Sequence, residues 1–274
     1  MPQMTINGFT MDYDRFGSKD QPTVVLVHGI TCDSSDWAAQ GEHLQQNYDV
    51  IAVNLNGHGR SATCLERCTM NHYAEDIVAI TGQLAVSPAV LVGHSMGSRV
   101  VLQAAVDRPD LFKSVVLVDG SRLADPESLK LAIADFQSKI ESTGYGPFMK
   151  AFFEHTFFDD ARTEIKNRVI DRAIHFEEVK GVTLFKEIMR WDANFCDIAT
   201  DTLSLPVFAI QTTSIADDGS RIPLQLGQRN AWLGLLERKL KNLSITVIPG
   251  AGHFPMLDHP GLFNSRLEKI LQTV

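Results

Sequence analysis

The stretch Ala89-Val90-Leu91-Val92-Gly93-His94-Ser95-Met96-Gly97 decides the fold of this chain. Its first four residues are apolar, as in a strand that is buried on both faces of a parallel sheet. From Met96 onward, apolar residues recur at helical spacing until Pro109, which predicts a helix. Glycines at positions 93 and 97 allow a sharp turn between the two elements, so the Ser95 hydroxyl is expected to stand exposed above the carboxyl edge of the sheet. This arrangement predicts a nucleophilic serine.

Further apolar runs predict the neighbouring strands of the same sheet. They cover residues 23–27, 50–53, 114–118, 207–210 and 245–248. Turns and helical patterns alternate with these runs, and such alternation builds a parallel sheet with right-handed connections. Residues 5–16 alternate in polarity around Asn7-Gly8, which predicts an antiparallel hairpin at one sheet edge. The expected fold class is therefore α/β, with a mostly parallel, doubly wound eight-stranded sheet.

Residues 122–202 interrupt this alternation. No strand-like run occurs there, and apolar residues instead recur at helical spacing, as at Leu129, Ile133 and Phe136. Because strands resume at residue 207, we expect an inserted helical cap. The predicted division is a core of residues 1–121 and 203–274 and a cap, or lid, of residues 122–202.

The composition of the 274 residues is that of a globular protein with a net charge of −8. Lys and Arg form no basic stripe, so neither nucleic acid nor a membrane surface is expected as a partner. No apolar run approaches the roughly 20 residues that span a bilayer, and the first residues do not resemble a secretory signal. The four scattered cysteines favour free thiols in a reducing compartment, and we expect a cytoplasmic protein.

The sequence carries no clear signal for a cofactor or a metal. No glycine-rich phosphate loop or dinucleotide signature follows the first long strand, so no organic cofactor is expected. Cys64, Cys68 and His72 are close in sequence, but the tight spacing and the fourth ligand of a metal site are missing. Cofactors and metals are therefore predicted to be absent.

A histidine that can accept the Ser95 proton follows the last predicted strand. His253 lies in the glycine-rich loop 250–254, which is expected at the same sheet edge as the serine. A serine hydroxyl needs such a base to attack a carbonyl carbon. Negative charge then develops on the substrate oxygen, and the backbone N–H groups of Met96 and Ile30 are expected to stabilise it as an oxyanion hole.

Five landmarks, in this order, resemble the α/β-hydrolase superfamily. They are Val27-His28-Gly29, Asn56-Gly57-His58-Gly59-Arg60-Ser61, residues 93–97, Val118-Asp119-Gly120 and Gly252-His253-Phe254-Pro255-Met256-Leu257. The resemblance covers nearly the whole chain, the cap least, and implies the α/β-hydrolase fold with Ser95 as nucleophile and His253 as base. It does not imply a substrate, because this fold hosts esterases, thioesterases, lactonases, carbon–carbon bond hydrolases, dehalogenases and cofactor-free dioxygenases.

The catalytic acid departs from the pattern that the resemblance implies. Most relatives carry it shortly after the strand that corresponds to residues 207–210, but no carboxylate occurs here until Asp217 and Asp218. Some members place the acid at the end of the preceding strand, where this chain has Asp119. We expect Asp119 to accept a hydrogen bond from His253 and hold it in the productive tautomer. Asp217 and Asp218 remain the alternatives, although an exposed turn explains them more plainly. A structural Asp119 that only braces loops is a further alternative.

The predicted cap holds many of the aromatic residues of the chain. A cap above the serine forms the roof of a pocket, so Trp191, Phe148 and Phe152 are expected to contact a small, hydrophobic substrate. These observations favour a serine hydrolase that cleaves carboxylic esters, or related thioesters or lactones, through an acyl-enzyme. The alternatives are a cofactor-independent dioxygenase of a heteroaromatic ring, a carbon–carbon bond hydrolase and a ligand-binding protein with slow turnover. A monomer and a homodimer are both compatible with the sequence.

Overall fold

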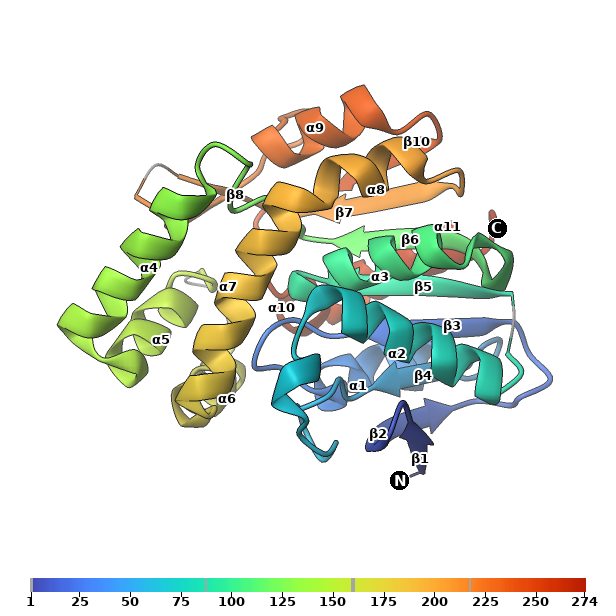
Figure 1. The fold of residues 1–274 in the computed structure, drawn as a ribbon. Coiled ribbons are helices and arrows are strands. Elements are labelled where there is room, and N and C mark those ends of the chain that lie inside the picture. The colour runs from blue at the N-terminus through green and yellow to red at the C-terminus, as the bar shows by residue number, and fades with distance from the viewer. Residues whose placement is uncertain (1, 87, 159–160, 217) are drawn as a thin grey trace.

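The computed structural model describes residues 2–86, 88–158, 161–216 and 218–274. Its centre is an eight-stranded sheet with the strand order β1-β2-β4-β3-β5-β6-β7-β10 (Figure 1). The strands are β1 (Gln3–Ile6), β2 (Phe9–Phe16), β3 (Thr23–Val27), β4 (Asp49–Val53), β5 (Ala89–His94), β6 (Phe112–Val118), β7 (Val207–Gln211) and β10 (Leu243–Val247). The last six are parallel to one another, whereas β1 and β2 pair antiparallel at one edge. The predicted fold class is confirmed.

Burial explains why these runs form central strands. Every residue of β3, β4 and β5 is buried, as expected for strands that helices cover on both faces. One face carries α2 (Met70–Gln83) and α3 (Met96–Asp107), and α1 (Ala38–Leu44) and α11 (Pro260–Leu271) lie behind the sheet in Figure 1. Since the central strands are parallel, their carboxyl ends meet at one edge of the sheet.

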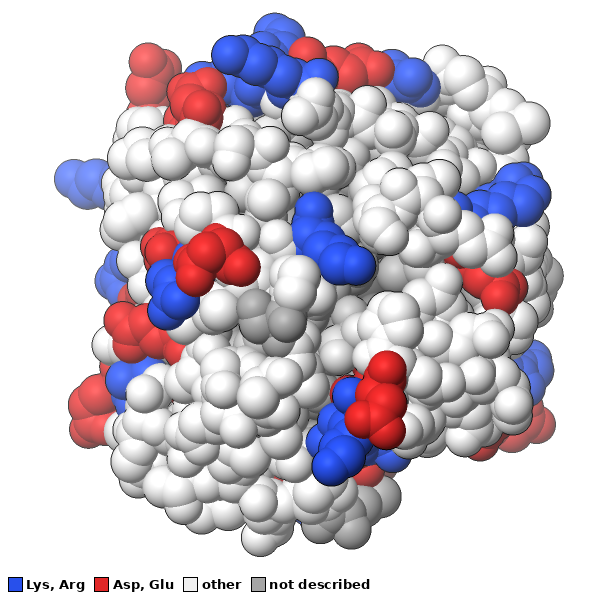
Figure 2. Space-filling model, turned by 90° about the vertical axis from the view of Figure 1, so that its right-hand side faces the viewer, with Lys and Arg blue, Asp and Glu red and all other residues white. Residues whose placement is uncertain are grey.

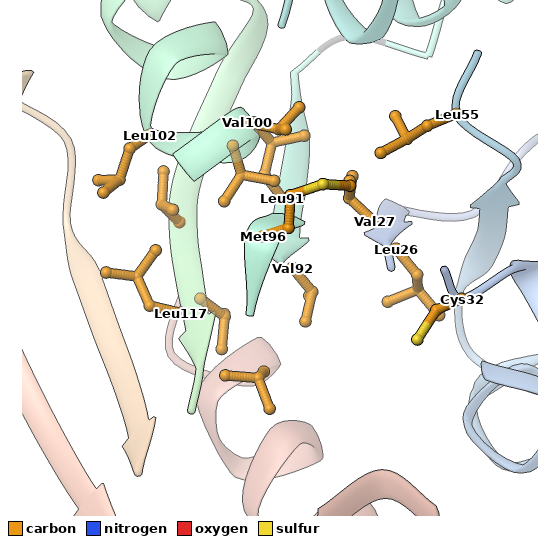
Figure 3. Packing of buried hydrophobic residues seen from close by; sticks show 14 of the residues in the cluster. Leu26, Val27, Cys32, Leu55, Leu91, Val92, Met96, Val100, Leu102 and Leu117 are labelled. Carbon is orange, nitrogen blue, oxygen red and sulfur yellow. The ribbon is translucent and has the colours of Figure 1, made fainter. Parts of the chain in front are cut away.

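The hydrophobic core extends to the turn between β5 and α3. Figure 3 shows side chains of β3, β5, β6 and α3 around this turn, among them Val27, Leu91, Met96 and Leu117. All four are fully buried. Because a close-packed interior resists displacement, the first residue of α3 is held firmly, while Ser95 just before it remains partly exposed.

The described residues between β6 and β7 are organised as helices. These helices are α4 (Leu129–Thr143), α5 (Tyr145–Glu154), α6 (Thr163–His175), α7 (Glu178–Asn194) and α8 (Cys196–Thr202). Figure 1 shows α4 and α5 beyond the carboxyl ends of the strands. In contrast, α8 packs against α3 and α9 (Ala231–Lys239). The division into a core of residues 1–121 and 203–274 and a cap of residues 122–202 stays a prediction.

A small second sheet lies where the sequence analysis expected only an exposed turn. Its strands β8 (Thr213–Ile215) and β9 (Arg221–Pro223) pair antiparallel. Gly219, with φ 85°, supplies the left-handed backbone that the connection requires. Strands of three residues are too short to show the alternation that identifies a strand in a sequence, which is why this hairpin was missed.

Figure 2 shows the face of the molecule that lies opposite α4 and α5. Lys and Arg side chains are scattered there, several of them beside Asp or Glu, and they form no continuous basic patch on this face. Among the residues described, no helix combines the length and the apolar character needed to cross a membrane.

Candidate active site

The turn between β5 and α3 holds Ser95 in a strained conformation. Its φ of 53° and ψ of −112° lie outside the regions that residues with a side chain usually adopt. A Cβ on Gly93 would lie 2.3 Å from the carbonyl oxygen of Gly97, and a Cβ on Gly97 would lie 2.5 Å from that of Val27. Only glycine fits at both positions, and this close approach lets the turn present the serine hydroxyl above the sheet.

Three side chains from distant parts of the sequence form one hydrogen-bonded chain. Nε2 of His253 lies 2.9 Å from Oγ of Ser95, and Nδ1 of His253 lies 2.6 Å from Oδ2 of Asp119. The side chains of His253 and Asp119 are buried, whereas Ser95 is partly exposed. The structure therefore brings the three sequence-based candidates together. With the Nδ1 proton donated to the carboxylate, Nε2 is left to accept the serine proton.

Hydrogen bonds hold the loop of His253 from three sides. The His253 N–H donates to the carbonyl of Thr156 at 2.8 Å, and the His253 carbonyl accepts from Nε2 of His94 at 2.8 Å. Oγ1 of Thr212 donates to the carbonyl of Gly252 at 2.7 Å. The imidazole is thus fixed in front of the serine before a substrate arrives.

Asp119 follows β6 and turns its carboxylate toward the end of β7. Its φ is 42°, an uncommon left-handed value for a residue with a side chain. The donors to its two oxygens are Nε2 of Gln211, the backbone N–H groups of Thr212 and Thr213, Oγ1 of Thr213, Nδ1 of His253 and Nη1 of Arg221. Burial alone would raise the pKa of this carboxyl, but the hydrogen bond from His253 and the charge of Arg221 hold it well below its usual range. Asp119 is therefore ionised at neutral pH.

The alternative acids are placed differently. Asp218 is exposed, and its carboxylate accepts a hydrogen bond of 2.8 Å from the N–H of Ser220. Asp217 lies outside the described residues. The geometry around His253 therefore favours Asp119.

Arg221 on β9 belongs to the same cluster and was not anticipated from the sequence. Its side chain is only 8% exposed, and Nη1 lies 3.0 Å from Oδ2 of Asp119. Burial lowers the pKa of His253 to about 4, and the charge of Arg221 adds to this effect, while the hydrogen bond and charge of Asp119 oppose it. His253 is therefore neutral at neutral pH, as a general base must be.

Ile30 and Met96 both border the cavity in front of Ser95. Met96 is the first residue of α3, so its N–H has no acceptor within the helix. Ile30 lies in a turn in which the next residue, Thr31, has φ 59°. The two residues lie where the oxyanion hole was predicted, and that role stays a prediction.

A cavity of about 620 Å³ includes Ser95 in its wall. Most of the remaining wall is apolar and comes from the helices between β6 and β7. Its apolar residues include Phe136, Phe148, Phe152, Phe185, Ile188 and Met189. Phe148 and Phe152 thus lie in the wall in which the sequence analysis placed them. A cavity of this size and character suits a small to medium apolar molecule.

Trp191 does not line this cavity, contrary to the sequence-based expectation. Its indole is buried, and Nε1 donates to Oε1 of Gln103 on α3 at 3.0 Å. The indole N–H finds its acceptor there, on the side of α7 that packs against α3. The cavity is instead lined by Phe185, Ile188 and Met189 of the same helix.

Four buried histidines around the site are expected to make the stability depend on pH. Burial lowers the pKa of His28 and His253 to about 4 and holds those of His58 and His94 well below the usual value. In the unfolded chain each pKa is about 6.5, so between pH 7 and 5.5 the unfolded state binds more protons than the folded state. The free energy of unfolding therefore decreases as the pH is lowered from about 7 to about 5.5. The expected loss is about 1 kcal/mol for each histidine and about 4 kcal/mol in total.

Urea denaturation at pH 7 and at pH 5.5 measures this loss. The interval lies above the usual pKa range of carboxyl groups, which therefore contribute little to it. A free energy of unfolding that is the same at both pH values would contradict the neutral state of these histidines.

The residues considered as a metal cluster do not converge. Sγ of Cys68 donates to the carbonyl of Cys64 at 3.6 Å, and Nδ1 of His72 lies 3.0 Å from Oγ1 of Thr69. Within the described part of the chain, no three His, Cys, Asp or Glu side chains are grouped so that they could hold a metal ion.

Comparison with known proteins identifies the family. Residues 22–260 match the family model for the α/β-hydrolase fold. A putative carbamate hydrolase, RutD of Caulobacter sp. (strain K31), is 24% identical over 279 residues, which cover 99% of this chain and 98% of that protein. The 2-(acetamidomethylene)succinate hydrolase of Mesorhizobium japonicum is 37% identical over 108 residues, which cover 39% of each chain.

Solved structures show the same fold at low identity. A thermophilic esterase from Thermogutta terrifontis has a TM-score of 0.81 and 21% identity, covering 100% of this chain and 99% of its own. The enol-lactonase from Burkholderia xenovorans LB400 has a TM-score of 0.79 and 20% identity, covering 99% of this chain and 100% of its own. Since the family model spans most of the sequence and the sheet has the expected order, this protein belongs to the α/β-hydrolase family.

Proposed function

We propose that the protein is a serine hydrolase that cleaves carboxylic esters, or related thioesters or lactones, of small to medium hydrophobic substrates. The observation that carries this proposal is the hydrogen-bonded chain Ser95–His253–Asp119 beside a largely apolar cavity. A neutral, buried imidazole in contact with a serine hydroxyl is the arrangement that activates this weak nucleophile.

The proposed reaction proceeds through an acyl-enzyme. Oγ of Ser95 attacks the carbonyl carbon while Nε2 of His253 takes its proton, and Asp119 stabilises the resulting imidazolium. The N–H groups of Met96 and Ile30 bind the oxyanion of the tetrahedral intermediate. His253 then protonates the leaving alcohol, and a water molecule, deprotonated by His253, releases the acid and restores Ser95.

The cavity supports the proposed substrate class. Phe148 and Phe152 belong to an apolar wall that favours an acyl or aryl group over a polar one. An esterase and an enol-lactonase among the structural relatives are compatible with this class, whereas a sequence relative that matches over nearly its full length is a putative carbamate hydrolase.

A fluorophosphonate probe tests the nucleophile. We expect one adduct on native protein, mapped to the peptide that contains Ser95, and none after the protein has been unfolded, because only the folded site activates the hydroxyl. A panel of p-nitrophenyl esters from acetate to octanoate tests the reaction. No adduct together with no turnover for any chain length would refute the proposal.

The alternative functions predict other outcomes on the same fold. A cofactor-independent dioxygenase would consume oxygen with a heteroaromatic substrate and would retain activity without the serine hydroxyl. A carbon–carbon bond hydrolase would leave the esters intact and cleave a diketone. A binding protein would hold a ligand tightly without releasing a product.

A further inference from the structure

The cavity wall beside Ser95 presents the positive ends of two buried ion pairs. Arg99 pairs with Asp192 at 2.7 Å, and Arg221 pairs with Asp119 at 3.0 Å. Both arginines line the cavity, whereas both carboxylates lie behind them and are at most 1% exposed. A substrate in this cavity therefore meets guanidinium groups and not their counterions.

The donors of Arg99 are largely occupied. Its Nε and Nη2 donate to the two carboxylate oxygens of Asp192, Nη2 donates to the carbonyl of Ser121 at 2.8 Å, and Nη1 donates to the carbonyl of Ser95 at 3.2 Å. Arg99 thus braces the serine turn against α7 and has little capacity left for a ligand.

Arg221 differs because one edge of its guanidinium is unused. Only Nη1 is hydrogen-bonded to other described residues, to Oδ2 of Asp119 and to Oγ1 of Thr213. Among the described residues, the buried polar atoms that lack a partner include none from Arg221, so its Nε and Nη2 reach accessible space. Arg221 borders two spaces, the cavity in front of Ser95 and a smaller pocket of about 60 Å³ beside Trp232, and of these two the cavity is the one that also contains Ser95.

This free edge is the one that recognises carboxylates. The N–H groups of Nε and Nη2 point in parallel from one side of the planar guanidinium and match the two oxygens of a carboxylate. Moreover, the side chain of Arg221 is only 8% exposed to water. Its counterion Asp119 also accepts hydrogen bonds from five other donors. A desolvated cation with unsatisfied donors favours an anionic ligand.

The other charges in the cavity wall are located where water screens them. Lys139 and Asp135 pair with each other at 2.8 Å and are both more than half exposed. Asp218 is exposed as well. These charges influence a bound substrate less than the buried guanidinium does.

We propose that Nε and Nη2 of Arg221 form a subsite for a carboxylate group of the substrate, next to the ester that Ser95 attacks. The preferred substrates are then apolar esters that carry one carboxylate, either on the acyl chain or on the leaving alcohol. This inference rests on the proposed ester hydrolysis, and it adds the substrate class to it.

Two substrate pairs that differ only in charge test the subsite. Monomethyl adipate is compared with methyl adipamate, and the butyrate ester of 4-hydroxybenzoate with that of 4-hydroxybenzamide. In at least one pair we expect kcat/KM to favour the carboxylate by roughly ten- to a hundredfold, the effect of a charge-assisted hydrogen bond to a buried cation. Arg221→Gln should abolish this ratio, and Arg221→Lys should restore part of it. Lys139→Gln, which removes an exposed cation from the same wall, should leave it unchanged.

The ratio separates recognition from support of the catalytic acid. If Arg221 only positioned Asp119, Arg221→Gln would slow both members of a pair equally and preserve the ratio, and this result would overturn the inference. Equal rates of the wild type for both members of both pairs would also overturn the inference. The proposed function would stand in that case, provided that the esters are cleaved and Ser95 is labelled.

The absence of ester cleavage and of Ser95 labelling would refute the proposed function. Even then, a binding measurement tests the carboxylate subsite by itself. Benzoate, but not benzamide, should raise the Tm of the wild type and of Arg221→Lys, but not that of Arg221→Gln. Equal effects of benzoate and benzamide on the wild type would overturn the subsite. The Tm of each variant without ligand also reports whether it is folded.

Discussion

Ser95→Ala is expected to lower kcat for p-nitrophenyl butyrate by roughly five orders of magnitude. Without Oγ no acyl-enzyme forms, and His253 has no hydroxyl to deprotonate at 2.9 Å. The residual rate would come from the oxyanion hole and from substrate binding alone. The substitution removes one hydrogen bond and no apolar contact of the core, so the free energy of unfolding should change by about 1 kcal/mol or less. Steady-state kinetics and urea denaturation of the same preparation measure both effects.

Ser98→Ala is a matched control for this variant. Ser98 lies in the first turn of α3, three residues after Ser95, and its Oγ donates to the carbonyl of Gly93 at 2.8 Å. It is 1% exposed and does not line the cavity, so kcat should stay within about threefold of the wild type despite the loss of a buried hydrogen bond. Oxygen-dependent turnover of a heteroaromatic compound by Ser95→Ala would contradict the hydrolase and support the dioxygenase.

The parts of this protein that could be predicted are those encoded by adjacent residues. Buried strands such as β3 and β5 are short apolar runs, and the turn at Ser95 needs glycines that are visible on either side of it. His253 could be placed because it follows the last strand of a parallel sheet, whose carboxyl ends share one edge. In each case a local pattern and one rule of topology were sufficient.

The acid could not be settled in this way, because its environment is assembled from two strand ends. Gln211, Thr212 and Thr213 lie where most relatives carry the acid, and all three donate to Asp119. Hydrogen-bond donors in place of a carboxylate at this position indicate that the acid comes from elsewhere. This signal can be read only when β6 and β7 are known to be neighbours. Their pairing joins residues more than 90 apart in the sequence.

Arg221 and Trp191 show two further limits. Arg221 lies on a hairpin whose strands have three residues each, and its partner Asp119 is 102 positions away, so no local pattern marks it. Trp191 lies on a helix that is buried against α3 on one side and lines the cavity on another. Helical spacing identifies apolar positions, but it does not tell which of two apolar faces meets the substrate.

Asp119→Asn is expected to lower kcat by about four orders of magnitude, because an amide cannot hold the imidazole in the productive tautomer or stabilise its cation. At this site the structure adds a second effect. The groups that are hydrogen-bonded to the two carboxylate oxygens are all donors, namely backbone and side-chain N–H groups, a hydroxyl and a guanidinium. The amide NH₂ of asparagine would face several of these donors without an acceptor, so we also expect a loss of about 1–3 kcal/mol in the free energy of unfolding.

The two effects can be separated experimentally. Circular dichroism and urea denaturation establish the folded fraction, and kcat is compared only under conditions in which both proteins are folded. Asp218→Asn and Asp217→Asn serve as matched controls, since they remove the alternative acids, and each should keep kcat within about threefold of the wild type. For Asp218 the reason is that an exposed charge contributes little to the site. A folded Asp119→Asn variant with nearly wild-type turnover would transfer the role of the acid to one of these two residues. Four lost orders of magnitude in Asp119→Asn alone would instead show that a carboxylate after β6, held by the end of β7, orients the imidazole in this protein.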